Sequence, residues 1–213
     1  MGHSQLDLTQ LKEMLLHVCQ DIQDTTEVLT QADKAIGDGD HGVGMARGFQ
    51  AVRQKIETQA FASVGDALKT VGTALLTSVG GASGAVFGTW FRSGAARLAD
   101  RQVFDGAALA VLLTDGLQGV KERGKAQPGD KTMIDALEPA AQAAQQLSDA
   151  NLDQALAAAV EAARQGMERT KDMVARLGKA QTLGERSLGH PDPGALSTYL
   201  ILKSMLEYVT AQR

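Results

Sequence analysis

The sequence is poor in cysteine, in aromatic residues and in basic charge, and each shortage excludes a class of protein. Cys19 is the only cysteine, which excludes an intrachain disulfide and a zinc site built from cysteines. The formal net charge of −4 argues against nucleic acid as the main partner, because phosphate backbones attract a basic surface.

Long apolar runs and targeting patterns are missing as well. No run of apolar residues is long enough to span a bilayer, so we expect no membrane partner. Residues Met1 to Gln5 lack the basic and apolar pattern of a signal peptide, so we expect a cytoplasmic protein.

The residues that are abundant favour helices. Aromatic residues make up only 4% of the chain and alternating β-branched residues are nearly absent, whereas alanine, leucine and glutamine are frequent. This composition predicts an all-α fold. The 213 residues are enough to bury a core, and we expect one domain over residues 1–213.

Apolar residues recur at helical spacing in eight segments. Asp105 is the expected N-cap of the fifth helix, and Asp192 and Pro193 are the expected N-cap and first residue of the eighth. The predicted helices cover residues of about 8–30, 43–59, 63–78, 85–99, 106–122, 131–147, 152–176 and 193–208.

The connections between these helices are of two kinds. Those after the first, third, fifth and seventh helices carry nearly all the glycine, aspartate and loop-borne basic residues. Short loops favour antiparallel neighbours, so these four connections are expected at one end of an up-and-down bundle. The pattern therefore predicts an eight-helix antiparallel bundle with its functional site at that end.

The first of these connections is acidic. Asp33, Asp38 and Asp40 lie within eight residues, and carboxylate oxygens are preferred Mg²⁺ ligands. An EF-hand does not fit, because Gly42 and Phe49 stand where it needs a ligand and a glutamate. A lone Asp-Gly-Asp is more often part of a solvated loop whose aspartates cap helices. The alternative is a loop that binds one or two Mg²⁺ ions against a polyphosphate.

The remaining connections carry further candidates for phosphate binding. Residues 80–84 are an anion site at a helix start or, because Gly84 and Gly88 are four apart, a point of close helix packing. His41 is structural or contacts a phosphate or the metal's second shell. Further candidates lie in the connection after the fifth helix, which is basic, and in the connection after the seventh helix, which is the longest. They are Gly124, Lys125, Gly129, Lys131, Thr132, Met133, Lys179, Arg186, His190, Asp192 and Gly194.

Four motifs occur together along the chain: IGDGDHG at 36–42, SVGGASG at 78–84, RGKAQPGDKTM at 123–133 and LGERSLGHPDPGA at 183–195. In this order they resemble the ADP-binding L subunit of phosphotransferase-system-dependent dihydroxyacetone kinase. The resemblance covers essentially the whole chain, and four co-occurring motifs make it specific.

The resemblance implies an eight-helix antiparallel barrel with the nucleotide at one end. It implies two Mg²⁺ ions held by Asp33, Asp38 and Asp40 against a resident ADP. A phosphohistidine on an M subunit would rephosphorylate this ADP in place. The resulting ATP would pass its γ-phosphoryl group to dihydroxyacetone held on a K subunit, which gives dihydroxyacetone phosphate.

The resemblance also assigns residues. Lys179 and the three aspartates are the implied catalytic residues, and the implied nucleotide contacts are His41, Gly42, Val43, Gly44, Ala82, Ser83, Gly124, Met133, Lys179, Asp192, Pro193 and Gly194. This chain departs from the family pattern in having Gly44 for a frequent asparagine, Lys179 for arginine and Ala85 for proline. Lysine keeps the charge of arginine but loses its planar fork.

Two other functions fit the same motifs. One is a kinase subunit that acts on another small ketose or tetrose, or uses free ATP. The other is a nucleotide-loaded binding module that regulates a partner without catalysis. Both functions would use the same metal site. Only a measurement of turnover distinguishes them from the subunit of a phosphotransferase-system-dependent dihydroxyacetone kinase.

Overall fold

The computed structural model describes residues 4–211, and these are mainly helical, which confirms the predicted all-α class. Two short strands, β1 (Gln5–Leu6) and β2 (Phe104–Asp105), form an antiparallel pair. The helices are α1 (Leu8–Asp24), α2 (Thr26–Ile36), α3 (His41–Glu57), α4 (Val64–Ser78), α5 (Gly81–Ala95), η1 (Ala96–Leu98), α6 (Gly106–Gly124), α7 (Ile134–Gln146), α8 (Leu152–Arg169), η2 (Thr170–Asp172), η3 (Lys179–Ser187) and α9 (Pro193–Ala211).

Neither α9 nor any other helix within residues 4–211 is both long enough and apolar enough to cross a membrane. The expectation of a cytoplasmic protein rests on residues Met1 to Gln5. Of these, Met1 to His3 lie outside the described residues.

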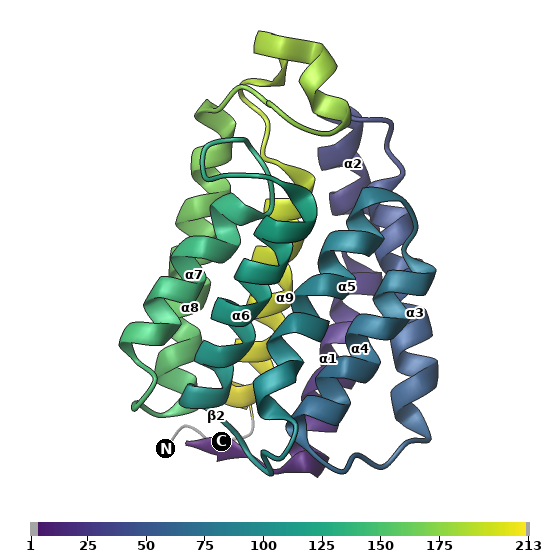
Figure 1. The fold of residues 1–213 in the computed structure, drawn as a ribbon. Helices are drawn as coiled ribbons and strands as arrows, with labels where there is room; N and C mark the ends of the chain where they lie inside the picture. Colours follow the sequence, from purple (N-terminus) through teal and green to yellow (C-terminus); the bar gives the residue numbers. More distant parts are fainter. Residues whose placement is uncertain (1–3, 212–213) are drawn as a thin grey trace.

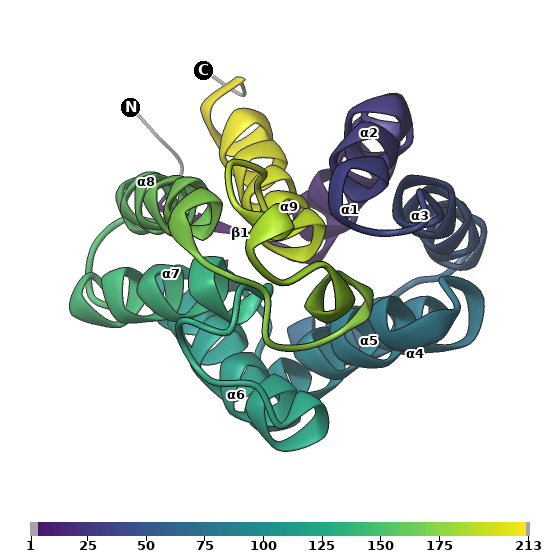
Figure 2. The ribbon, with the colours of Figure 1, turned by 90° about the horizontal axis from the view of Figure 1, so that it is seen from above.

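The long helices stand side by side in a closed ring, seen from above in Figure 2. Helices that follow one another from α3 to α9 pack together, and α1 closes the ring by packing on both α3 and α9. Helix α2 stands at the upper end in Figure 1, where it continues α1 after a break. The ring confirms the predicted antiparallel barrel, with α1 and α2 in the place of one predicted helix.

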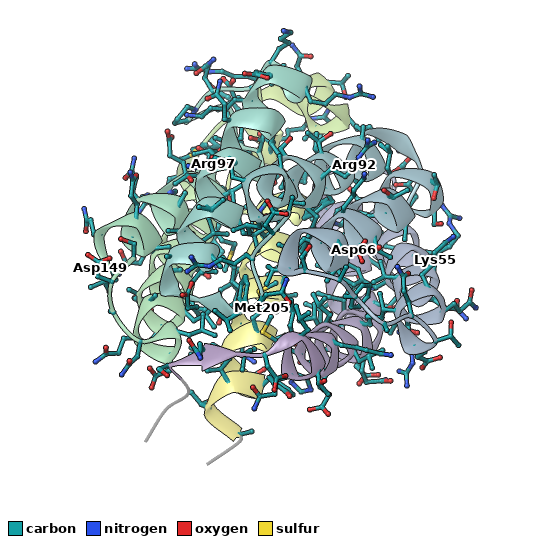
Figure 3. All side chains as sticks on the ribbon, turned by 60° about the horizontal axis from the view of Figure 1, so that its bottom comes forward. Lys55, Asp66, Arg92, Arg97, Asp149 and Met205 are labelled. Atoms are coloured by element: carbon teal, nitrogen blue, oxygen red, sulfur yellow. The ribbon has the colours of Figure 1, made fainter. Side chains whose placement is uncertain are left out.

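The interior of the ring is apolar because each helix turns one stripe of its surface inward. Phe87, Trp90 and Phe91, which recur at helical spacing, are at most 1% exposed and form part of this core, as expected. Met205 also lies inside, whereas the charged side chains of Lys55 and Asp149 lie on the outside (Figure 3).

The prediction of one helix over residues 8–30 is wrong in its extent. The helix breaks at Thr25, whose hydroxyl bonds to the carbonyl oxygens of Asp21 and Ile22 at 3.0 and 3.2 Å. Thr26 bonds to the carbonyl oxygen of Gln23 in the same way, at 2.5 Å. Such bonds compete with the helical ladder. The second piece, α2, then runs on to Ile36 and carries Asp33 on its last turns.

Other boundaries differ from the prediction as well, three of them beside the later site. Helix α5 begins at Gly81, because Gly80 with φ 86° makes the turn after α4. Helix α7 begins at Ile134, since Lys131 has a left-handed backbone with φ 61°. Helix α8 ends at Arg169, and the long loop that follows contains the 3₁₀ helix η3.

Helices α4 and α5 approach closely where Gly72 faces Gly88. A Cβ atom at Gly88 would stand 2.8 Å from the Gly72 carbonyl oxygen and 2.7 Å from the Leu76 Cβ. Because one of these neighbours is backbone, the helices would have to move apart to admit a side chain.

We therefore predict that Gly88→Ala destabilises the fold by about 1–3 kcal/mol, the usual range for overpacking. Urea unfolding of the nucleotide-free protein measures this. Gly124→Ala is the control, because its Cβ would meet its nearest neighbour, Val86 Cγ1, at 3.8 Å. Equal stability of Gly88→Ala and the unmodified protein would contradict the close contact.

Candidate functional site

One end of the ring holds a cavity of about 510 Å³. The connections that follow α2, α4, α6 and α8 all contribute to its wall. This confirms that the four glycine-, aspartate- and lysine-bearing connections converge. Residues 173–192, which we call the capping segment, lie above the helix ends in Figure 1.

Most of the predicted site residues line this cavity. They are Asp33, Asp40, His41, Val43, Gly44, Ala82, Ser83, Gly124, Lys131, Thr132, Met133, Lys179, Asp192, Pro193 and Gly194. Of the residues that the resemblance assigns, two do not: Asp38, which contacts Lys179, and Gly42, where a Cβ would collide with the Thr26 carbonyl oxygen at 2.3 Å. Gly42 thus permits close packing of α3 on α2. The loop candidates Lys125, Gly129, Arg186 and His190 do not line the cavity either.

The three aspartates gather at the start of α3. One carboxylate oxygen from each of Asp33, Asp38 and Asp40 lies within 4.8 Å of the other two. Asp33 Oδ2 also accepts a hydrogen bond from the backbone N–H of His41 at 3.1 Å. Gly37 is required here, because a Cβ would stand 2.1 Å from Asp33 Oδ1.

Lys179 brings positive charge to this cluster from the capping segment. Its Nζ atom donates to Asp38 Oδ2 and, at 3.0 Å, to Asp40 Oδ2. These bonds hold the pKa of the Asp38 carboxyl below its ordinary value and raise the pKa of Lys179. The cluster therefore accommodates a cation, and its donor set of carboxylate oxygens suits Mg²⁺.

His41 joins the aspartate loop to the glycine turn. Its Nδ1 lies 3.1 Å from Ser83 Oγ, and its Nε2 lies 2.8 Å from Ser197 Oγ on α9. Burial lowers the pKa of the His41 imidazole, which favours the neutral form. With both ring nitrogens engaged, His41 orients Ser83. Sequence reasoning missed Ser197, because a serine within an apolar helix carries no local signal of such a contact.

The glycine turn between α4 and α5 is held in place by Arg47, which also lines the cavity. Its guanidinium donates to the carbonyl oxygens of Ser78 at 2.7 Å and Val79 at 2.6 Å. Gly80 and Gly81 both have positive φ, and the first backbone N–H groups of α5 follow them. Such N–H groups favour anions. Arg47 was missed, because on α3 it has the pattern of an ordinary exposed residue.

The two interpretations of the glycine motif apply to different residues. Close packing accounts for Gly88, whereas a Cβ at Gly84 would meet its nearest neighbours only at 3.4 Å, an ordinary contact, and Gly81 has nothing within 4 Å. The turn at Gly80 and Gly81 is therefore not explained by packing.

Apolar side chains also line the cavity, beside its polar residues. Flat and branched side chains of this kind bury the uncharged part of a ligand. The residues of this apolar lining are Ile36, Val79, Val86, Phe87, Val120, Ala126, Met133, Ile134 and Leu177. A ligand with an anionic end and an apolar ring fits this combination.

Asp192 begins α9, as predicted. Its Oδ2 accepts the backbone N–H of Ala195 at 2.7 Å, which caps the helix. Burial raises the pKa of this carboxyl from 3.8 to about 7. The folded protein therefore retains a proton here that the unfolded chain has already lost near neutral pH.

This raised pKa predicts a pH-dependent stability. The contribution of Asp192 is complete below its unfolded pKa, about 4, and is lost as the pH rises to about 7. Between pH 5 and 7 the unmodified protein should lose stability relative to Asp192→Asn, by at most about 1.4 kcal/mol per pH unit. Urea unfolding of both nucleotide-free proteins at several pH values tests this, and parallel profiles would refute it.

Comparisons with known proteins agree with this geometry. The DAK2 domain family matches residues 35–207. The chain is 44% identical to the ADP-binding subunit DhaL of the PEP-dependent dihydroxyacetone kinase of Escherichia coli (strain K12), over 94% of this chain and 96% of that subunit. Identity to the ADP-binding subunit DhaL of Listeria innocua kinase 1 is 40%, over 87% and 89% of the two chains.

A solved structure shares the fold. The dihydroxyacetone kinase from C. freundii, in complex with AMP-PNP and Mg²⁺, aligns with a TM-score of 0.72 at 29% identity. The alignment covers 92% of this chain but only 33% of the kinase, so this chain corresponds to about a third of that protein. The chain therefore belongs to the DAK2 domain family, with the ADP-binding subunits of PEP-dependent dihydroxyacetone kinases among its relatives.

Proposed function

We propose that this chain is the ADP- and ATP-carrying subunit of a PEP-dependent dihydroxyacetone kinase, a phosphotransferase. The observation that carries the proposal is the convergence of three aspartates, a glycine turn and Lys179 on one cavity that apolar side chains also line. The names of the relatives that match over nearly their whole length support it.

Asp33, Asp38 and Asp40 are the proposed ligands of two Mg²⁺ ions. When bound, Mg²⁺ would neutralise charge on the phosphates of the nucleotide. The N–H groups that follow Gly80 would donate to phosphate oxygens, and Ser83, oriented by His41, would add a hydroxyl. The apolar lining would bury the base, beside the α9 start at Asp192, Pro193 and Gly194.

Lys179 is the proposed charge stabiliser for phosphoryl transfer. It lies on the capping segment, lines the cavity, and already contacts two of the metal-binding carboxylates. Catalysis of this kind depends on positioning and charge neutralisation more than on an acid–base pair. An ammonium supplies the charge without the two-pronged geometry of a guanidinium.

The proposed partners are a phosphohistidine M subunit, which phosphorylates the resident ADP, and a K subunit, which holds dihydroxyacetone. All three would work in the cytoplasm. A mixture of this chain, K and M subunits, phosphoenolpyruvate and the general phosphotransferase proteins should form dihydroxyacetone phosphate. Activity with free ATP but none with phosphoenolpyruvate would overturn the proposal, and no specific observation favours the two alternatives.

The metal site gives a first prediction. Asp38→Ala removes one of three carboxylates and should abolish Mg²⁺-dependent retention of nucleotide, which is measured as nucleotide released on denaturing the purified protein. Asp149→Ala is the control, because Asp149 lies exposed at the other end of the ring (Figure 3). One ADP per chain in Asp38→Ala would contradict the assignment.

The second prediction concerns the charge stabiliser. Lys179→Met should lower kcat by on the order of 100-fold or more while nucleotide retention persists. Lys179→Arg should restore most of the rate. Arg176→Met serves as control, because this basic side chain of the capping segment is 73% exposed and does not line the cavity. An unchanged kcat in Lys179→Met would remove Lys179 from the mechanism.

A further inference from the structure

We infer that Lys131 is a positioning residue: its buried ammonium fixes the start of α9 in place beside the cavity. The inference rests on the proposed function, because it concerns the helix start that would contact the nucleotide. The sequence offered Lys131 as a candidate for phosphate binding, and it lines the cavity. The contacts of its side chain indicate a different role.

The Lys131 side chain is almost completely buried, at 2% exposure. Its Nζ atom donates to the carbonyl oxygens of Thr170 and His190, both at 2.6 Å. Within residues 4–211 no carboxylate lies within 4.0 Å of it. A lysine that is buried without an ion pair is uncommon, since burial of a charge is costly unless the charge is well bonded.

The two carbonyl groups belong to different parts of the chain. Thr170 follows the end of α8, and His190 lies two residues before the N-cap of α9. Lys131 itself stands in the connection between α6 and α7. One ammonium therefore ties the connection between α6 and α7 to both ends of the connection between α8 and α9, at the site end of the ring.

A second bond ties the same segments. The backbone N–H of Asp192 donates to Thr170 Oγ1 at 2.9 Å, and Thr170 is completely buried. Gly194 lies against Met133, since a Cβ at Gly194 would stand 3.3 Å from the Met133 Cβ. The position of Asp192, Pro193 and Gly194 relative to Met133 thus depends on the bonds made by Lys131 and Thr170.

The backbone of Lys131 is also constrained. Its φ of 61° is left-handed, a conformation that non-glycine residues rarely adopt. Asp135 holds this turn by accepting the backbone N–H groups of Gly129 at 2.6 Å and Thr132 at 2.8 Å. The contacts of Asp135 thus hold a backbone conformation that lysine would not otherwise favour.

Burial and the surrounding carboxylates shift the pKa of Lys131 in opposite directions. Burial lowers the pKa of Lys131, whereas the more distant charges of Asp192, Asp135 and Asp172 raise it. These charges favour the ammonium at that place without forming ion pairs with it.

Lys131→Met tests the inference, because methionine keeps most of the side-chain volume and removes the charge and the donors. Hydrogen exchange of the nucleotide-free protein should accelerate in residues 189–195 and not in α4 or α5. The Kd of ADP with Mg²⁺ should rise by about 10–100-fold, as is usual for groups that support ligand-binding residues. Lys131→Arg, which keeps charge and donors, should recover part of the affinity.

Lys125→Met is the matched control. Lys125 lies in the same connection and has the same left-handed backbone, with φ 55°, but its side chain is exposed and does not line the cavity. Its exchange pattern and ADP affinity should equal those of the unmodified protein.

Three results would overturn the inference. The first is an unchanged ADP affinity in Lys131→Met. The second is a loss of affinity without faster exchange at 189–195, which would indicate direct contact with the nucleotide. The third is a uniform acceleration of exchange, which would indicate only a weaker core. Failure of the unmodified protein to bind ADP would instead contradict the proposed function. The exchange comparison does not use nucleotide and would still test Lys131.

A second variant tests the same inference in case Lys131→Met does not fold. Thr170→Val keeps the shape of the side chain and removes the acceptor of the Asp192 N–H. It should accelerate exchange at the same residues 189–195 and weaken ADP binding in the same direction. Unchanged exchange and affinity in Thr170→Val would show that the α9 start needs no such ties, and would overturn the inference.

Discussion

Mutual repulsion among Asp33, Asp38 and Asp40 is the constraint around which the site end of this protein is organised. Three carboxylate oxygens within 4.8 Å of one another are unfavourable unless positive charge lies between or beside them. The fold brings Lys179 to them from a segment about 140 residues further along the chain. The Asp33 carboxylate is further stabilised by the His41 N–H, where α3 begins.

The ring of helices makes this arrangement possible. The short pair of strands β1 and β2 lies at its far end (Figure 1), and its interior is filled with apolar side chains. Close contacts such as that of Gly72 with Gly88 hold the helices at short distances. The helices therefore present their connections on a rigid frame, and the chemistry is confined to one end. Rigid support of this kind is what a phosphate- and metal-binding site requires.

The helical pattern of the sequence predicted an antiparallel bundle and the convergence of four connections, because both follow from the apolar spacing and the order of the helices along the chain. The closed ring was implied only by the family resemblance. The break at Thr25 was not predictable from periodicity, since apolar spacing continues through it while the threonine hydroxyls end the helix. Arg47, Ser197 and the bonds of Lys131 were beyond reach for another reason. Each makes its contacts with residues 31 or more positions away, and no local pattern marks such partners.

The capping segment has a kinetic consequence. It carries Lys179 over the cavity, and Leu177, Gly178 and Ala180 of the same segment form part of the wall. A nucleotide bound in this cavity, as proposed, would be held in part by this segment. The off-rate of the nucleotide would then depend on how often the segment moves away from the aspartates as well as on the phosphate contacts. Such a subunit would turn over many times on one nucleotide, with exchange against the surrounding pool far slower than catalysis.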